Sequence, residues 1–168
     1  MAQDFSEKKY PAIRYFIGDI RDQDRLDFAC QTADFVVHTA ALKHVELAEY
    51  NPFETVLTNI IGAQNLIEIC LKKNIDKVVL ISTDKAVAPI NLYGSTKLTA
   101  EKLFISANIF KGNKRTKFSV VRYGNVMGSR GSVIPILLRQ NQQNKNFTVT
   151  DKNMTRFNIT LDQAVKFV

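Results

Sequence analysis

Apolar and polar residues follow two patterns along this chain, one typical of buried strands and the other of amphipathic helices. Apolar runs at 34–38, 77–82 and 118–123 have the length and the β-branched content of strands covered on both faces. Between 52 and 73, apolar residues return every three or four positions, which predicts a helix with one buried face. Strands and helices in regular alternation predict an α/β fold with a doubly wound parallel sheet.

Weaker patterns complete this alternation. Two short β-prone runs, at 13–16 and 147–150, predict additional strands. Apolar spacing predicts further helices over residues 22–30, 92–110 and 132–143 and from 161 onward. At 168 residues the chain has the size of one domain with its own core.

The sequence lacks a glycine-rich phosphate-binding turn. Dinucleotide-binding folds begin with a strand and a G-x-G-x-x-G turn that leads into a helix. The nearest approach to it, Gly-Ser-Arg-Gly at 128–131, has the wrong spacing and lies far from the first strand. Two interpretations stay open at this point: the fold binds no nucleotide, or its first βαβ unit is missing from this chain.

Composition narrows the class of partner. A formal net charge of +7 suits either nucleic acid or a small anionic substrate such as a nucleoside diphosphate. The basic residues are scattered rather than gathered on one helix, so we do not expect nucleic-acid binding. Cys30 and Cys70 stand far apart, without a CxxC motif or clustered histidines, so we expect neither a disulfide framework nor a metal site.

The sequence shows no sign of a membrane span or a secretion signal. No apolar run approaches the length that a bilayer requires, and the first residues are polar and include an acid. Together with the isolated cysteines, this predicts a cytoplasmic protein that does not interact with a membrane.

Polar residues follow the predicted strands, where doubly wound sheets bind their ligands. Thr83, Asp84 and Lys85 come after the 77–82 strand and offer a hydroxyl, a proton donor and a base, unless they form an ordinary solvated loop. Tyr93 and Lys97 lie four residues apart, on one face of a predicted helix. A nearby ammonium stabilises a phenolate, so we expect Lys97 to lower the pKa of Tyr93.

The two other strand ends also carry candidate residues. The small-residue segment at 39–42 lets a cofactor pass close to the backbone, and Lys43 follows it. Asn125 can donate and accept toward a substrate, or it belongs to a tight structural turn. Arg130 and Arg156 are bidentate donors suited to a diphosphate, and an ordinary surface arginine is the alternative for each.

Five segments taken together resemble the extended short-chain dehydrogenases and, within them, the UDP-N-acetylglucosamine 4,6-dehydratases of polysaccharide biosynthesis. These segments are TAALKH at 39–44, EYNP at 49–52, STDKA at 82–86, PINLYGSTK at 89–97 and VRYGNV at 121–126. Tyr93 and the MTRF segment at 154–157 are similar to the inverting subgroup, which acts in pseudaminic-acid biosynthesis. The resemblance covers residues 18–168.

The resemblance implies a Rossmann-like fold that lacks its first βαβ unit. Residues 1–168 would form part of an NAD(P)-binding domain, and the substrate-binding region would start at about residue 130. We therefore expect a chain that is shortened at its N-terminus and stops before most of the substrate-binding region. The family also suggests a homo-oligomer.

The resemblance implies ligands and roles for individual residues. The cofactor would be NADP, with NAD as the alternative, and the substrate a UDP-sugar. The residues that match the cofactor site are Asp19, Ile20, Thr39, Ala40, Ala41, Tyr93, Lys97 and Val126. Those that match the substrate site are Lys43, Asn125, Arg130 and Arg156, and the catalytic residues would be Thr83, Asp84, Lys85 and Tyr93.

The implied reaction is the removal of water from the sugar. Tyr93 would assist oxidation at C4, Lys85 would remove the C5 proton, and Asp84 would protonate the departing C6 hydroxyl. Reduction at C6 and reprotonation of C5 on the opposite face would complete the turnover. Two alternatives stay open: a nucleotide-sugar 4-epimerase, which would need neither Asp84 nor Lys85, and an inactive remnant that serves as a binding module.

Overall fold

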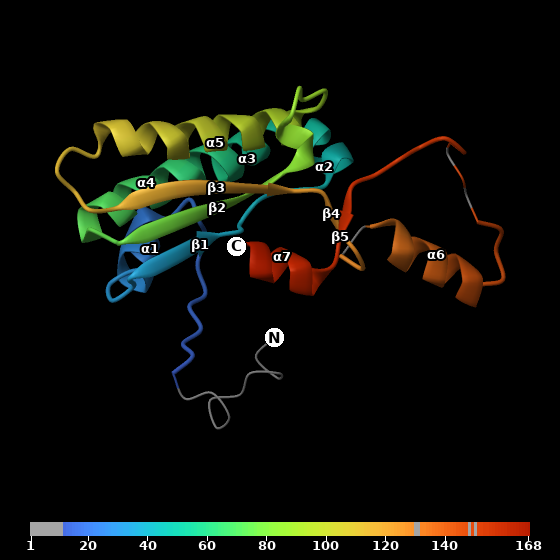
Figure 1. Cartoon of the computed structure of the whole chain (residues 1–168), viewed down its shortest axis with the longest axis horizontal. Coiled ribbons are helices and arrows are strands. Elements are labelled where there is room, and N and C mark those ends of the chain that lie inside the picture. The colour runs from blue at the N-terminus through green and yellow to red at the C-terminus, as the bar shows by residue number, and fades with distance from the viewer. Residues whose placement is uncertain (1–11, 130–131, 148, 150) are drawn as a thin grey trace.

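Three parallel strands form the centre of the computed structural model, which describes residues 12–129, 132–147, 149 and 151–168. β1 (Phe35–His38), β2 (Lys77–Thr83) and β3 (Lys117–Tyr123) lie side by side in the order β1-β2-β3 (Figure 1). The register places Ser82 opposite Arg122. The three main strands and the parallel α/β class are confirmed, and the carboxyl ends of the strands meet at one edge of the sheet.

Helices pack on one face of this sheet. α4 (Gly62–Lys73) lies in the connection from β1 to β2, and α5 (Leu92–Phe110) connects β2 to β3 (Figure 1). α1 (Gln23–Ala29) precedes β1 and packs against α4. The helices predicted over 22–30 and 92–110 are therefore confirmed, the second with the same bounds.

The helix predicted over 52–73 is one continuous run that contains a wider turn. α3 (Pro52–Val56) has its proline in the first turn, where a missing N–H leaves no helical hydrogen bond unmade. A π-helical turn, η1 (Leu57–Ile61), follows, and α4 completes the run. Apolar spacing alone does not reveal such a turn, because one extra residue shifts the buried face by only part of a turn.

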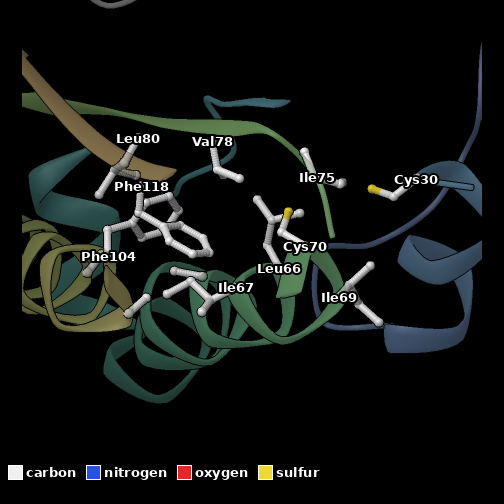
Figure 2. Close-up of a cluster of buried hydrophobic side chains, with 13 residues drawn as sticks. Cys30, Leu66, Ile67, Ile69, Cys70, Ile75, Val78, Leu80, Phe104 and Phe118 are labelled. Carbon is white, nitrogen blue, oxygen red and sulfur yellow. The ribbon is translucent and has the colours of Figure 1, made fainter. Parts of the chain in front are cut away.

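The hydrophobic core lies between the sheet and these helices. Val78 and Leu80 of β2 and Phe118 of β3 join Leu66 of α4 and Phe104 of α5 in one cluster (Figure 2). The most exposed of these five side chains, Phe118, is 5% exposed. Burial of an apolar side chain of this size stabilises the fold by roughly 1.5–3 kcal/mol, so the core holds the register that positions the strand ends.

A small second sheet lies beyond the end of β3. β4 (Asn125–Val126) pairs in parallel with β5 (Asn158–Ile159). Gly124, just before β4, lies against the backbone of Phe157: a Cβ at position 124 would be 2.3 Å from the Phe157 carbonyl oxygen. Glycine at this position therefore allows the C-terminal part of the chain to close on the end of β3.

Four short helical elements complete the described part of the chain. α6 (Val133–Gln142) and α7 (Leu161–Phe167) confirm the two helices predicted near the C-terminus. α2 (Val45–Tyr50) and the 3-10 turn η2 (Asp84–Ala86) were not predicted, because each is too short to leave a periodic pattern. Figure 1 shows α6 and the β4–β5 pair set apart from the main helices, beyond the strand ends.

The strands predicted at 13–16 and 147–150 are not observed as predicted. The strand predicted at 13–16 is wrong: these residues have no regular structure, since no described strand lies beside them to complete a ladder. The strand predicted at 147–150 lies partly outside the described residues, at 148 and 150, and Phe147 and Val149 belong to no strand. None of the helices in the described ranges is long and apolar enough to cross a bilayer.

Candidate active site

A cleft of about 460 Å³ opens at the carboxyl ends of the three central strands. In parallel sheets this edge carries ligand sites, because the loops that follow the strands converge there. The predicted site residues that line the cleft are Thr39, Ala41, Lys43, Thr83, Lys85, Tyr93, Lys97, Asn125 and Val126. Residues that were not predicted as site residues also line it, among them Ile81, Tyr123, Ser129 and Ser132.

Thr83, Asp84 and Lys85 form a hydrogen-bonded turn at the end of β2. Thr83 Oγ1 accepts from the backbone N–H of Lys85 at 3.3 Å and donates to Asp84 Oδ1 at 3.0 Å. Lys85 Nζ donates to the same oxygen of Asp84 at 3.1 Å and to Asn125 Oδ1 at 3.3 Å. Because Asn125 follows the neighbouring strand β3, the sheet brings an acid, an amine and an amide into one cluster.

The first turn of α5 brings Tyr93 to this cluster. Asn91 caps the helix, since its Oδ1 accepts from the backbone N–H of Gly94 at 2.8 Å. A Cβ on Gly94 would lie 2.2 Å from the Lys85 carbonyl oxygen, so helix and turn approach so closely that only glycine fits. Tyr93 is 9% exposed, and its side chain lies near that of Thr83.

Burial dominates the ionisation of Tyr93 and Lys97. It raises the pKa of Tyr93, while the nearby Thr83 side chain lowers it. It also lowers the pKa of Lys97 to about 8, against the raising effect of the Glu101 carboxylate. The Lys97 Nζ donates to the Ile81 carbonyl oxygen at 2.7 Å. The prediction of a lowered Tyr93 pKa is therefore wrong for this structure, because desolvation of the phenolate outweighs the other effects.

A buried amide holds the loop that follows β1. Asn59, in the π-helical turn η1, is 2% exposed. Its Oδ1 accepts from the Leu42 backbone N–H at 2.8 Å, and its Nδ2 donates to the Leu42 carbonyl oxygen and to Thr96 Oγ1, each at 3.0 Å. One side chain thus ties the loop to α5. Asn59 was not among the predicted site residues; its signal in the sequence is a polar residue within the apolar pattern of 52–73.

A second buried polar cluster lies behind the cleft. Glu101, 3% exposed, accepts a hydrogen bond from the hydroxyl of Ser82, which lines the cleft. It also accepts from Arg122, at 2.8 Å from Nε and 2.5 Å from Nη2. Glu101 was not among the predicted site residues either, although it continues the four-residue spacing of Tyr93 and Lys97.

Of the two predicted arginines, Arg156 belongs to the described residues, and it does not line the cleft. Arg156 is exposed and lines a neighbouring hollow of about 410 Å³, which Asp84 also lines and which shares Lys85 with the cleft. Its guanidinium donates to the Thr155 carbonyl oxygen at 2.8 Å. Arg130 lies outside the described residues.

Three predicted cofactor residues do not line the cleft in the described part of the chain. Asp19 is exposed, and its hydrogen bonds with Arg21 lower its pKa to about 2. Ile20 packs at the edge of the hydrophobic core. Ala40 is exposed and does not line the cleft, although the residue on either side of it does.

A phenol, an amine and a hydroxyl line the cleft, and the amine and the hydroxyl are hydrogen-bonded to the carboxyl of Asp84, which lines the neighbouring hollow. Such a set supports proton transfer at adjacent atoms of a bound polyhydroxyl ligand. Thr39 and Ala41 are small, which leaves the backbone after β1 accessible to a nucleotide, and Lys97 adds a buried cation to the same cleft. Within the described ranges, no group of three His, Cys, Asp or Glu side chains is arranged to hold a metal ion.

Comparison with known proteins identifies a family and relatives that match nearly the whole of this chain. The family model of the polysaccharide biosynthesis proteins matches residues 1–168. The UDP-N-acetylglucosamine 4,6-dehydratase (inverting) of Campylobacter jejuni subsp. jejuni is 54% identical over 94% of this chain and 48% of its own. The UDP-glucose 4-epimerase of Rickettsia bellii is 45% identical over 94% of this chain and 46% of its own. This chain therefore spans about half the length of the curated relatives that it matches.

Solved structures share the fold. The X-ray structure of Pen from Bacillus thuringiensis matches with a TM-score of 0.94 and 51% identity, over 99% of this chain and 52% of its own. A DesIV double mutant, a dTDP-glucose 4,6-dehydratase from Streptomyces venezuelae with NAD bound, matches with a TM-score of 0.84. At 20% identity, over 95% of this chain and 54% of its own, that second match shows the fold alone. The predicted Rossmann-like, extended short-chain dehydrogenase fold class is confirmed.

Proposed function

The chain belongs to the polysaccharide biosynthesis protein family, and from this premise we propose that it carries the catalytic centre of a nucleotide-sugar 4,6-dehydratase. The proposed substrate is UDP-N-acetylglucosamine, and the product is a 4-keto-6-deoxy sugar inverted at C5. The observation that carries the proposal is the hydrogen-bonded cluster of Thr83, Asp84, Lys85 and Asn125 beside Tyr93. A dehydratase needs a base at C5 and an acid at C6, and this cluster supplies both.

The residues of the chain move the protons in this proposal. A bound nicotinamide dinucleotide supplies the redox chemistry at C4 and C6. Tyr93 Oη in its phenolate form accepts the proton of the C4 hydroxyl and later releases it to solvent, and Thr83 lies beside it. Lys85 Nζ takes the C5 proton, and Asp84 gives a proton to the C6 oxygen, which leaves as water. After reduction at C6, a solvent proton adds to C5 on the opposite face. Asp84 and Lys85 are 3.1 Å apart, so a proton can pass between them before the next turnover.

We propose NADP as the dinucleotide, with NAD as the alternative. The small residues Thr39 and Ala41, the buried Lys97 and the cleft volume of about 460 Å³ support a dinucleotide site. The sequence resemblance favours NADP, whereas the Streptomyces venezuelae structure carries NAD. Calorimetric titration of the natural full-length protein with each dinucleotide decides between them.

For the UDP moiety we propose positively charged and amide ligands. Lys43 and Asn125 line the cleft, and Arg156 lines the adjoining hollow. Arg130 is the fourth proposed ligand. We also propose that the substrate-binding region starts at about residue 130. Arginine suits a diphosphate because its guanidinium can donate two parallel hydrogen bonds.

The test compares Lys85→Met with Tyr93→Phe in the natural full-length protein. UDP-N-acetylglucosamine in deuterated water is followed by NMR, and the nicotinamide absorbance is recorded in parallel. We expect the parent to form a 4-keto-6-deoxy sugar that is deuterated and inverted at C5. Lys85→Met should change the nicotinamide absorbance without loss of water, and Tyr93→Phe should do neither.

Lys102→Met, at an exposed site on α5, is the matched control and should turn over normally. Dehydration by Lys85→Met refutes the assigned roles.

A nucleotide-sugar 4-epimerase is the second candidate, favoured by the identity to the Rickettsia bellii relative. Epimerisation at C4 uses Tyr93 and needs no acid and base at C6 and C5. The same experiment then yields a C4 epimer without loss of water, and Lys85→Met is as active as the parent. If the full-length protein binds no dinucleotide, the result supports the remaining alternative, an inactive binding module.

A further inference from the structure

The face of α5 that carries Tyr93 and Lys97 continues to a third buried polar residue, Glu101. The three residues lie four positions apart, so they project from one side of the helix. Lys97 and Glu101 are each 3% exposed. A buried carboxylate is costly unless it is paired and hydrogen-bonded, so the partners of Glu101 indicate its role.

Two neighbouring strands hold the Glu101 carboxylate. Arg122 of β3 donates to Oε1 from Nε at 2.8 Å and to Oε2 from Nη2 at 2.5 Å, which fixes the plane of the carboxylate. Ser82 of β2 donates its hydroxyl hydrogen to Oε1. Ser82 and Arg122 are register partners, so the sheet presents both donors together.

The negative charge of the Glu101 carboxylate also raises the pKa of Lys97. The ammonium of Lys97 has a neutral hydrogen-bond acceptor, the Ile81 carbonyl oxygen, at 2.7 Å. Burial lowers the pKa of Lys97 to about 8, and Glu101 raises it. Loss of that carboxylate would leave the ammonium with less negative charge to offset its desolvation.

The other titratable groups around Lys97 do not replace Glu101. His38 of β1 is neutral at pH 7, because burial and the charge of Lys97 lower its pKa to about 4. Burial raises the pKa values of Tyr93 and Tyr123, so both are also neutral at pH 7. The charged and titratable groups that complete the surroundings are the Asp84–Lys85 ion pair, Arg122 on Glu101, and the cleft residues Lys43 and His44.

We infer that Glu101 is a positioning residue: it keeps Lys97 charged and fixes the hydroxyl of Ser82 at the wall of the cleft. This inference rests on the proposed function, because the charge of Lys97 affects turnover only if Tyr93 acts on a bound sugar. An ammonium on the same helix face favours the phenolate form of Tyr93, in opposition to burial. Arg122 limits the effect, since its positive charge partly cancels that of Glu101.

The test is an NMR titration of the Lys97 side chain in the natural full-length protein, with the resonance assigned by Lys97→Arg. Glu101→Gln keeps the shape of the side chain and removes its charge, so the Lys97 midpoint should fall by about one pH unit. Arg122→Gln leaves the carboxylate uncompensated, so the midpoint should rise. Glu68→Gln removes an exposed carboxylate on α4 and should leave the midpoint unchanged.

An unchanged Lys97 midpoint in a folded Glu101→Gln protein overturns the inference. If Glu101→Gln does not fold, the titration of Arg122→Gln decides instead. A Lys97 midpoint that falls or stays unchanged in that variant overturns the inference. In turnover, Glu101→Gln should move the alkaline limb of the pH profile to lower pH, and the charge-retaining Glu101→Asp should restore it. A loss that is equal at every pH indicates a merely structural role and overturns the inference.

The titration requires no turnover, so it separates the two proposals. A full-length protein that shows the expected shifts but forms no 4-keto sugar supports the action of Glu101 on Lys97 and refutes the dehydratase. A protein that dehydrates its substrate without the shifts supports the dehydratase and refutes the role of Glu101.

Discussion

Gly94, at the start of α5, lies directly against the carbonyl oxygen of Lys85, where a Cβ would come within 2.2 Å of it. This contact sets the spacing between the helix that carries Tyr93 and the turn that carries Lys85. The helix end cannot shift freely, because Asn91 caps it through the backbone N–H of Gly94 itself. The geometry of the cleft therefore depends on a residue without a side chain.

Gly94→Ala should destabilise the protein by about 1–3 kcal/mol, because the added methyl group overpacks a backbone contact that has no room. Urea denaturation of the natural full-length protein measures the free energy of unfolding. Ser95→Ala, at an exposed position in the same turn, is the control and should stay within about 0.5 kcal/mol of the parent. Equal stability of the parent and Gly94→Ala would contradict the close contact.

Asn59→Ala should loosen the loop that follows β1. The substitution leaves the backbone N–H and carbonyl of Leu42 without their buried partner, at a cost of about 2–4 kcal/mol in the free energy of unfolding. Hydrogen exchange of the Leu42 amide should become faster than in the parent.

Asn65→Ala is the matched control for this effect. Asn65 is a buried asparagine of α4 that donates to the Arg21 carbonyl oxygen at 3.0 Å rather than to the cleft loop. Its loss should destabilise the fold while the loop and dinucleotide binding change little. Similar exchange rates at Leu42 in both variants would show that Asn59 does not hold the loop.

His38 should make the protein less stable in mild acid. It is 4% exposed and stacks on Phe104, and burial, then the charge of Lys97, lower its pKa from 6.5 to about 4. The unfolded chain therefore binds this proton first, and the free energy of unfolding falls as pH drops from 6.5 toward 4. One such group contributes roughly 3 kcal/mol over that window.

Urea denaturation at a series of pH values measures the contribution of His38. His38→Gln removes the titration, so the free energy of unfolding should vary less between pH 6.5 and 4 than in the parent. The slope is compared rather than the absolute stability, because the substitution also alters the packing on Phe104. Equal slopes in the two proteins would show that His38 is not the responsible group.

The two cysteines should resist thiol reagents in the native state. Cys30 and Cys70 are free thiols in the hydrophobic cluster (Figure 2), and burial raises the pKa of Cys70 to about 12. Because the thiolate is the reactive form, modification requires opening of the core. An aromatic disulfide reagent should react about 100-fold more slowly without urea than with it. Rapid modification of both thiols in native protein would contradict this packing.

Local patterns were enough to predict several elements and site residues. The helix at 92–110 was predicted with its observed bounds, and the structure shows that Asn91 caps its first turn. Polar residues directly after apolar strands, such as Thr83, Lys85 and Asn125, also identified part of the lining of the cleft. The strand predicted at 13–16 failed for a physical reason, because strand structure requires a neighbouring strand that a local pattern does not specify.

By itself, then, the sequence determined the class of fold, the main helices and strands, and the chemical groups gathered at the strand ends. Only the tertiary structure decided which of these groups meet: Lys85 with Asn125, 40 residues apart, and Ser82 and Arg122 on Glu101. It also decided their ionisation, as the raised pKa of Tyr93 shows. Periodicity and capping act between near neighbours in the chain, whereas contact and desolvation depend on packing between distant segments.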